Sequence, residues 1–560
     1  MMRRFTLNRS RSAGPGRRRW RSRSVGSGLV AVALAVVLAA CGGSSGSSGS
    51  ASGGPSGIVT ASLGNSSSFQ DNFNPFSPSV EDPAYGMIYE PLMFFDTAQD
   101  GNVQPWLAKS YAWGAGGKSI TFQLRSGVKW NDGQPFTASD VAYTFNLIKT
   151  STALNQYGLP IVGATASGNS VTLTFSKPVY SDLIYFASRV AILPQHIWSK
   201  VKDPATWTDP KPVGTGAYEV AKVTPQVMEL TANPHYYVAG VPKVKTYEYL
   251  TYSSNTTSDT ALEQGQLDWA SAYIPNINKV YLAKNPNFKV TDIPLSVGFL
   301  TSNMKKGPTT SLAVRQAISD AIDRNYISQA VYNGYAPPTN AAALLLPDFK
   351  NVEAPAAQGT FGAADPAKSK KILQQAGIKL PLTLTVKTVT GYTDYDSILQ
   401  ILQPELKAAG INLVVDDEAY SVWAADQDTG NFQLLMTSAG YTPDPYSYYY
   451  NLIDSAVAAP LGTSESIGNF GRFQNATVDA DLAKIAATTN PAVQKPLFAQ
   501  IESVFAQQTP DIPLFEQQDE IEFNGNKVTG YPTTSNAYAG PPTWMQWDGG
   551  WVADHLAPAK

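Results

Sequence analysis

Cysteine and histidine are the residues that this sequence has least of. Cys41 is the only cysteine among 560 residues, so no disulfide can form within the chain and its stability must come from hydrophobic cores. His196, His235 and His555 are far apart, and none has a metal-site spacing such as His-x-x-x-His. No Gly-x-Ser-x-Gly elbow follows a predicted strand. These absences leave a hydrolase without a supporting motif and offer a soft metal few ligands.

Acidic residues and lysine are missing from the first forty residues, which carry nine arginines. Residues 29–40 (LVAVALAVVLAA) form an apolar run of twelve residues at the end of this segment. The run is too short to span a bilayer comfortably, but it has the length of the hydrophobic region of a secretory leader. We therefore predict a signal peptide over residues 1–40.

The single cysteine follows this apolar run directly. Leu38-Ala39-Ala40-Cys41 resembles the lipobox of bacterial lipoproteins, in which the leader is cut before the cysteine and the thiol is diacylated. An ordinary signal-peptidase site beside a stray cysteine is the alternative. Residues 42–57 (GGSSGSSGSASGGPSG) are typical of a flexible tether. We predict that 41–57 is a lipidated cysteine followed by a tether that holds the folded part off the membrane.

Without its predicted leader the chain is acidic. The loss of nine arginines leaves 32 lysines and arginines against 44 aspartates and glutamates, a net charge of −12. An acidic protein is a poor partner for nucleic acid, so none is expected. The 28 tyrosines and 11 tryptophans could line a binding cleft or form a tyrosine-rich surface, and composition does not separate the two.

A strand, a turn and a helix are predicted between residues 119 and 149. Apolar and polar side chains alternate over 120–125, as in a strand with one buried face. Residues 131–133 (NDG) supply turn chemistry. Thr137 and Asp140 then stand at the spacing of a capping box, and apolar residues follow at helical intervals.

Residues 121–141 (TFQLRSGVKWNDGQPFTASDV) closely resemble the signature of the peptide/nickel-type (family 5) extracytoplasmic solute-binding proteins, the receptors of ABC importers. Further landmarks of that family are 89–92 (YEPL), 192–198 (ILPQHIW), 212–218 (PVGTGAY) and 265–269 (GQLDW). The Gly-Thr-Gly of 212–218 lacks the third glycine of a nucleotide-binding loop, so we interpret it as a tight turn.

The resemblance implies an α/β fold of the two-lobed periplasmic-binding-protein type (Venus-flytrap, class II or cluster C) with an extra subdomain in the first lobe. On this basis we assign residues 58–90, 215–297 and 526–560 to lobe I. Residues 91–214 are assigned to the inserted subdomain, and 298–525 to lobe II.

Helix signals mark the beginning of the second lobe. Apolar residues at 314, 317, 318, 321 and 322 predict an amphipathic helix, with Arg315, Asp320 and Arg324 off its buried face. Asp365-Pro366 and Gly377 have the chemistry of the first and last residues of another helix.

Strands and helices then alternate. Strands are predicted at 382–386, 412–415 and 432–436, with helices near 397–409 and around Val422, the pattern of a parallel α/β sheet. Pro404 lies inside the longest of these helices and should bend or break it.

The loop after the strand at 432–436, residues 438–450, is our first candidate for ligand binding. Strand ends of an open α/β lobe face the ligand crevice, and in the peptide-binding members an aspartate of this loop pairs with the peptide amine. Asp444 is the one acid between Tyr441 and Pro445, and it is equally a turn-forming residue. Tyr441 and Tyr446 could flank a peptide or stack on sugar rings. The complete set of candidate substrate-binding residues is Asn74, Trp269, Trp423, Tyr441, Asp444 and Tyr446.

We therefore expect a receptor anchored by lipid to the outer face of the bacterial cell membrane. It captures a small solute, an oligopeptide or dipeptide or alternatively an oligosaccharide, and hands it to ABC permease subunits driven by a separate ATPase. The membrane is contacted through the lipid alone, the protein is a monomer, and no catalysis, cofactor or bound metal is expected. A secreted lipoprotein hydrolase is the alternative from another class.

Overall fold

The computed structural model describes residues 57–63, 68–96, 98, 102–271, 273–343, 361–440, 442, 444–464, 467–540, 542–543 and 546–559. The predicted signal peptide, Cys41 and all but the last residue of the tether lie outside them, and so does Tyr441. Among the described residues, no helix combines the length and the apolar character needed to cross a membrane.

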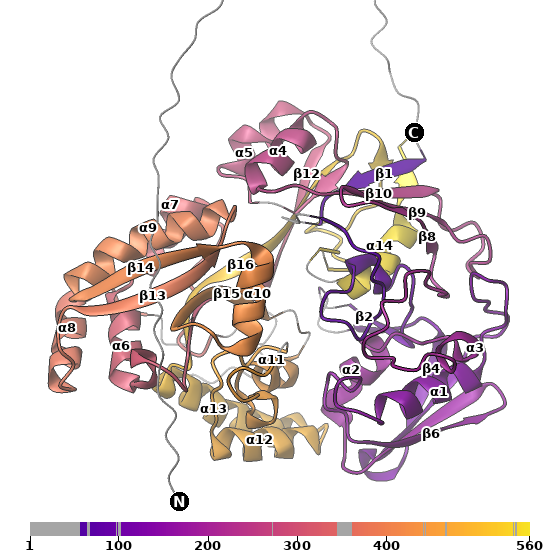
Figure 1. The fold of residues 1–560 in the computed structure, drawn as a ribbon, viewed down its shortest axis with the longest axis horizontal. Helices are drawn as coiled ribbons and strands as arrows, with labels where there is room; N and C mark the ends of the chain where they lie inside the picture. Colours follow the sequence, from indigo (N-terminus) through magenta and orange to yellow (C-terminus); the bar gives the residue numbers. More distant parts are fainter. Residues whose placement is uncertain are drawn as a thin grey trace, which may run out of the picture. The chain divides into compact units, whose positions relative to one another are not determined.

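A ten-stranded sheet runs through both lobes (Figure 1). Its strands, in spatial order, are β14 (Ile411–Glu418), β13 (Leu382–Val389), β15 (Leu434–Gly440), β12 (Phe288–Ser302), β16 (Asp511–Asn524), β11 (Trp269–Ala270), β1 (Ile58–Ala61), β10 (Thr246–Leu250), β9 (Val227–Ala232) and β8 (Tyr218–Val223). The long strands β12 and β16 pair antiparallel from Phe288–Asn524 to Thr301–Asp511. Because β12 also pairs with β15 and β16 also pairs with β11, these two strands join the lobes.

The first lobe contains one half of the sheet, strands β1 and β8–β11, together with three helices. These are α4 (Asn255–Glu263), α5 (Ile277–Val280) and α14 (Gly549–His555), with the short pair β17 (Val528–Thr529) and β18 (Ala557–Pro558). A second sheet has the order β4 (Ala108–Trp113), β5 (Ser119–Leu124), β7 (Ser170–Phe175), β6 (Ile161–Ser167). The remaining elements of this part are β2 (Met93–Asp96), β3 (Asn102–Pro105), α1 (Ala138–Ile148), α2 (Leu183–Ser188) and α3 (Gln195–Trp198).

The predicted strand, turn and helix around residue 130 are confirmed. Ile120, Phe122 and Leu124 of β5 are buried while their neighbours are not. Thr137 donates its backbone N–H to Asp140 Oδ2 at 2.8 Å, the contact expected of a capping box, and α1 begins at the next residue.

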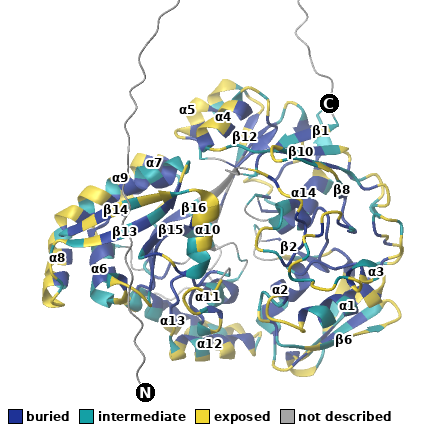
Figure 2. Ribbon diagram, in the orientation of Figure 1, coloured by how far each residue is buried: buried dark blue, intermediate teal, exposed yellow. Residues whose placement is uncertain are grey.

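In the second lobe β13 runs parallel to both β14 and β15, as the alternation of strands and helices predicts. Its helices are α6 (Leu312–Ala321), α7 (Arg324–Tyr332), α8 (Pro366–Gln375), α9 (Thr393–Ala408), α10 (Tyr420–Thr429), α11 (Pro445–Ile453), α12 (Ala476–Ala486) and α13 (Pro491–Gln508). Figure 2 shows buried residues along the strands and exposed ones along the outer faces of α8 and α12. Asp365 caps α8 by accepting from Lys368 N–H at 2.8 Å, as predicted.

Pro404, which was expected to bend or break its helix, does not break it, because α9 continues through it to Ala408. Pro404 and Gln400, whose carbonyl loses its intrahelical donor, are both exposed, so water can satisfy that oxygen. Leu399, Leu402 and Leu406 on the opposite face are buried and hold the helix in place.

The expectation that Arg315 and Arg324 lie off the buried face is also wrong. Both side chains are buried, Arg315 with 2% of its surface exposed and Arg324 with 3%. The Arg315 guanidinium donates to the carbonyls of Thr309 (2.8 Å), Gln508 (2.8 Å) and Thr509 (3.0 Å). A guanidinium has five donors in a fixed fork, so it can satisfy several carbonyls at once where a helix meets a loop.

We predict that Arg315→Met destabilises the protein by about 3 kcal/mol, because the carbonyls of Thr309, Gln508 and Thr509 lose their donor. Denaturant unfolding at neutral pH measures the change. Gln316→Met, one residue along the same helix and partly exposed, is the control and should stay within about 0.5 kcal/mol. Equal effects of the two substitutions would contradict a carbonyl-binding role for Arg315.

Candidate ligand-binding site

Asp444 begins α11 as its N-cap. Its carboxylate accepts the backbone N–H of Ser447 at 2.9 Å, which satisfies one of the donors left free at a helix start. Burial raises the pKa of Asp444, and hydrogen bonds with Ser447 act in the opposite direction. The carboxylate therefore has a structural partner, although its predicted role as an amine anchor stays untested.

Helix α11 of the second lobe contacts α2 of the first. Tyr185 Oη donates to Asn451 Oδ1 at 2.9 Å. The Tyr185 ring stacks on Tyr157 at 5.0 Å between centroids and lies 6.4 Å from the ring of Tyr450. We call this contact between α2 and α11 the seam. It brings tyrosines from three distant parts of the sequence together.

The seam includes one of the predicted site residues, Tyr446. Its ring stacks on Tyr450 at 5.7 Å. Burial raises the pKa of Asp182, at the start of α2, to about 6, against the opposing effects of the Lys177 charge and a hydrogen bond from Tyr446. Asp182, at 8% exposed, and Tyr446, at 6%, are thus largely shielded from water.

A cation lies beside the seam, in a pocket that sequence reasoning missed. Arg189 lines this pocket with Gln156, Tyr157 and Trp547. Only 10% of the Arg189 side chain is exposed. It donates to Ser188 Oγ at 3.3 Å, and its nearest carboxylate is Asp548, 4.0 Å away. A cation inside the apolar segment 183–194 (LIYFASRVAILP) was a signal available in the sequence, whereas nothing there indicated Trp547.

Three other predicted residues lie elsewhere. The Asn74 amide donates to the carbonyls of Pro204 (2.8 Å) and Trp207 (2.5 Å) and is fully buried. Trp269 is also fully buried and donates its ring N–H to Tyr247 Oη at 2.9 Å. Trp423 packs in a small core with Phe432 and others, 8% exposed. These contacts are structural, and contact with ligand stays a prediction for all three.

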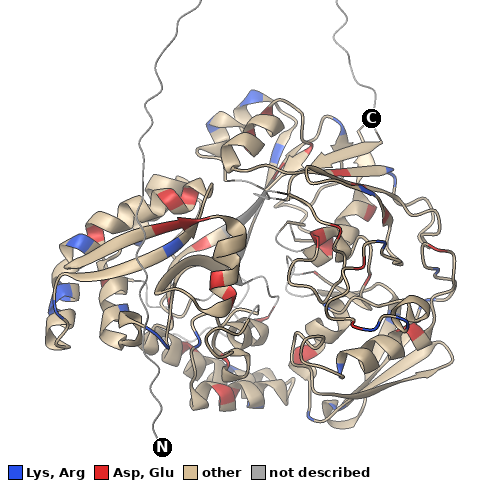
Figure 3. Ribbon diagram, viewed as in Figure 1, with Lys and Arg blue, Asp and Glu red and all other residues tan. Residues whose placement is uncertain are grey.

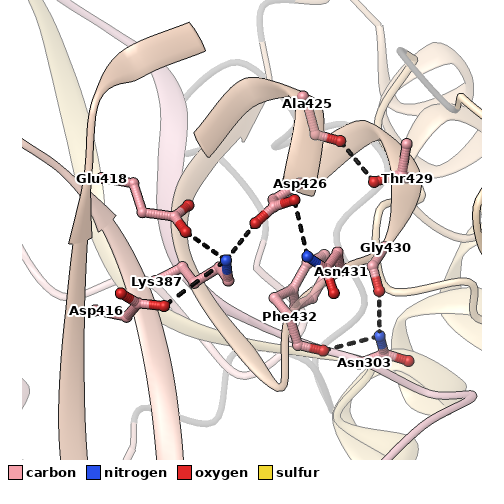
Figure 4. Close-up of polar contacts among 10 residues, drawn as sticks. All are labelled: Asn303, Lys387, Asp416, Glu418, Ala425, Asp426, Thr429, Gly430, Asn431 and Phe432. Carbon is pink, nitrogen blue, oxygen red and sulfur yellow. Dashed lines mark hydrogen bonds and ion pairs between the residues drawn. The ribbon is translucent and has the colours of Figure 1, made fainter. Parts of the chain in front are cut away.

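A cluster of charges fastens α10, the helix that carries Trp423, to the sheet (Figure 4). Lys387 Nζ lies 2.5 Å from Glu418 Oε1 and 3.7 Å from Asp416 Oδ2, and it also contacts Asp426 Oδ2 on α10. Figure 3 shows acidic residues on both β14 and α10. Burial alone would raise the pKa of Asp426. Hydrogen bonds from Lys387 and Asn431 outweigh that effect and lower the pKa.

Comparison with known proteins identifies the class. The family model of the bacterial extracellular solute-binding proteins, family 5 (middle), matches residues 102–459. This match covers more than half of the chain, and the chain therefore belongs to that family of extracytoplasmic solute-binding receptors.

Three relatives illustrate the likeness. A putative ABC transporter peptide-binding protein of Brucella ovis is 27% identical over 445 residues, 76% of this chain and 80% of the relative. The periplasmic oligopeptide-binding protein of Thermotoga maritima, solved with bound mannohexaose, has a TM-score of 0.82 at 24% identity, over 90% of this chain and 98% of that one. The oligopeptide-binding protein of Bacillus subtilis, solved with a nonapeptide, has a TM-score of 0.77 at 20% identity, over 90% and 100%. The predicted two-lobed α/β fold is confirmed.

We predict that Lys387→Met destabilises the protein by about 3 kcal/mol at pH 7, because three carboxylates then repel one another without a partner. The pKa of Asp426 is depressed in the folded state, so its contribution is present above the unfolded value of about 3.9 and is lost as pH falls below it. The difference from wild type should therefore shrink in acid. Denaturant unfolding at pH 7 and at pH 3.5 measures both effects.

Lys368→Met is the matched control, since Lys368 pairs with Asp320 at 3.0 Å but is 59% exposed. It should cost less than about 1 kcal/mol. If the two lysines prove equally dispensable, the cluster at Lys387 does not fasten α10.

Proposed function

We propose that this protein is the lipid-anchored substrate-binding receptor of an ABC importer and that it captures a peptide-like solute between its lobes. Membership of the family supports a receptor that works with permease and ATPase subunits. The long pair β12–β16 is the natural hinge, since it is the part of the sheet shared by both lobes. The protein acts as a monomer that delivers its solute to the permease.

Arg189 is the observation that favours a peptide-like solute. A mostly buried guanidinium binds a carboxylate by two parallel hydrogen bonds, and low exposure strengthens that attraction. Its carboxylate neighbour Asp548 is 4.0 Å away and also accepts the N–H of Gly540 at 2.8 Å. Burial raises the pKa of Asp548 to about 7, so this neighbour neutralises Arg189 only in part near neutral pH. The guanidinium donors that Asp548 does not take are those that we propose for the carboxylate end of a peptide.

An oligosaccharide is the second candidate. Paired rings close to the pocket, Tyr85 with Trp547 at 4.6 Å and Tyr157 with Tyr185 at 5.0 Å, favour it because sugar rings pack on aromatic faces. The solved relative with mannohexaose adds to this support. We do not propose a hydrolase, since the family is one of solute-binding receptors.

Binding of a peptide with a free carboxylate should close the lobes without any turnover. We expect tri-alanine to reduce the radius of gyration in X-ray scattering and to shift tryptophan fluorescence, because Trp547 lies in the pocket beside Arg189. Arg189→Met should weaken tri-alanine binding by about 10- to 100-fold, the loss expected for a charged hydrogen-bond pair. Tri-alanine amide should be affected far less.

Lys200→Met is the control for this measurement, because Lys200 is an exposed cation of the same part of the chain and should leave both affinities unchanged. Equal loss for the acid and the amide in Arg189→Met would remove Arg189 as a carboxylate site. Tight binding of mannohexaose together with no binding of tri-alanine would move the oligosaccharide to first place.

Lipidation is tested separately at Cys41. Cys41→Ser should leave the leader uncut or release the protein from the membrane, because two acyl chains give stable anchoring and no other membrane element is proposed. Fractionation of cells and mass spectrometry of the N-terminus measure the two results. A mutant that is still processed and still sediments with membranes would contradict the lipid anchor.

A further inference from the structure

Asp548 faces Arg189 without forming a hydrogen bond to it. The Asp548 side chain is fully buried, and its Oδ1 atom lies 4.0 Å from the nearest guanidinium nitrogen of Arg189. A hydrogen bond between nitrogen and oxygen needs about 3.2 Å or less, so this contact is electrostatic only. Within the part of the chain that the structure describes, Asp548 Oδ1 has no hydrogen-bond donor. Buried acid oxygens normally have one, so this atom requires an explanation.

The other oxygen of the same carboxylate is held in place. Asp548 Oδ2 accepts the backbone N–H of Gly540 at 2.8 Å. Asp548 ends the 3-10 turn Gln546–Asp548, directly before α14. The fold therefore holds Oδ2 on Gly540 and leaves Oδ1 on the side of Arg189.

Arg189 also has donors to spare. Its side chain is 10% exposed, and among the described residues it makes one side-chain hydrogen bond, to Ser188 Oγ at 3.3 Å. A guanidinium has five N–H donors. Trp547, the residue before Asp548, lines the same pocket as Arg189. A solute carboxylate bound to the remaining donors of Arg189 would therefore lie beside Asp548.

Two carboxylates beside one buried guanidinium do not both stay ionised, because like charges that share a site raise the pKa of one of them. Burial already raises the pKa of Asp548 to about 7, although the Arg189 charge and the Gly540 N–H oppose the rise, and the Asp96 charge adds to it. The terminal carboxyl of a peptide has an ordinary pKa of about 3.5. The proton should therefore go to Asp548 and leave the solute ionised.

We propose that a carboxylate solute binds at Arg189 together with one proton, which Asp548 takes up from water at Oδ1. The inference rests on the proposed function and deepens it, because it adds regulation by pH to the Arg189 site. The charge of the site is conserved, since the negative charge of the solute replaces that of Asp548. Protonation also turns Oδ1 into a hydroxyl that can donate to the solute carboxylate.

The preference for tri-alanine over tri-alanine amide, measured by calorimetric titration, should depend on pH. Asp548 ionises as pH rises through about 7, and the proton must then be restored before the carboxylate binds. The preference should therefore fall by about tenfold between pH 6 and pH 8. The peptide amine titrates in both ligands, so its effect largely cancels in the ratio. In Asp548→Asn, which cannot ionise, the preference should stay constant over this range.

Asp554→Asn is the matched control. Asp554 lies on α14, and burial raises its pKa to about 7 as well. Its Oδ2 accepts from Tyr236 Oη at 2.7 Å, so its partner is a tyrosine and not Arg189. The substitution removes an acid that titrates in the same range, and the tenfold fall should remain.

Other groups near Asp548 are tested by the same comparison. The charged groups that face it are Arg189, at the end of α2, and Asp96, on β2, while Tyr157 borders Arg189. Asp548→Asn leaves all three in place. A pH dependence that survives in this variant would therefore belong to one of them.

Proton uptake can be measured in wild-type protein, so the test does not require the variant to fold. Calorimetry at pH 7 is carried out in phosphate and in Tris, two buffers with different ionisation enthalpies. The difference between the two binding enthalpies gives the number of protons taken up. Tri-alanine should take up about half a proton more than tri-alanine amide, because Asp548 is about half ionised at this pH.

The outcomes separate the proton coupling from the receptor. Equal proton uptake with the acid and the amide, or a pH dependence that survives in Asp548→Asn, overturns the coupling and leaves Arg189 as the carboxylate site. If Arg189→Met weakens the acid and the amide equally, the carboxylate site and the coupling fail together. If wild-type protein binds neither peptide, the peptide assignment fails with them.

Discussion

The antiparallel pairing of β12 with β16 is the interaction on which the rest of the architecture depends. Fourteen residues of β16 run beside β12, and through their outer neighbours the two strands join the sheets of both lobes. The pairing is irregular between Gly298 and Phe299, where the register shifts. Gly298 is required there by packing, since an added Cβ would lie 2.5 Å from the ring of Phe515. A two-strand connection of this kind is where bending between two lobes can occur, the motion that we propose for ligand capture.

This constraint explains why the candidate site draws on such distant segments. The β12–β16 pair joins the lobes, and α2 of one lobe meets α11 of the other although more than 250 residues separate Tyr185 from Asn451. Buried charges along these surfaces have partners: Arg189 has Asp548, Lys387 has three carboxylates, and Asp182 is hydrogen-bonded by Tyr446.

Local structure could be predicted from sequence, but the site could not. The capping box at Thr137, the cap at Asp365 and the strand around Leu384 rest on interactions between near neighbours, which sequence displays. The burial of Arg315 depends on the carbonyls of residues 508 and 509, far along the chain. The amphipathic spacing of the helix cannot predict contacts with such distant residues. Trp547 is positioned by contacts with Tyr85, more than 450 residues away. Candidates chosen for their residue type, such as Asn74 and Trp269, instead have structural partners.

The same reasoning explains why the family is recognisable while its ligand is not. The segments that carry the resemblance meet one another in space: Asn131 of the signature donates its N–H to Gly214 O at 2.9 Å, and Gly216 donates to Ile88 O at 2.9 Å. Gly214 permits this approach, since a Cβ there would lie 1.9 Å from the Ile88 oxygen. Landmarks that pack on each other form a scaffold, and a scaffold is shared by receptors with different solutes. A shared scaffold therefore identifies the family, whereas ligand choice depends on side chains for which the scaffold sets position but not chemistry, and Arg189 is the one that we propose.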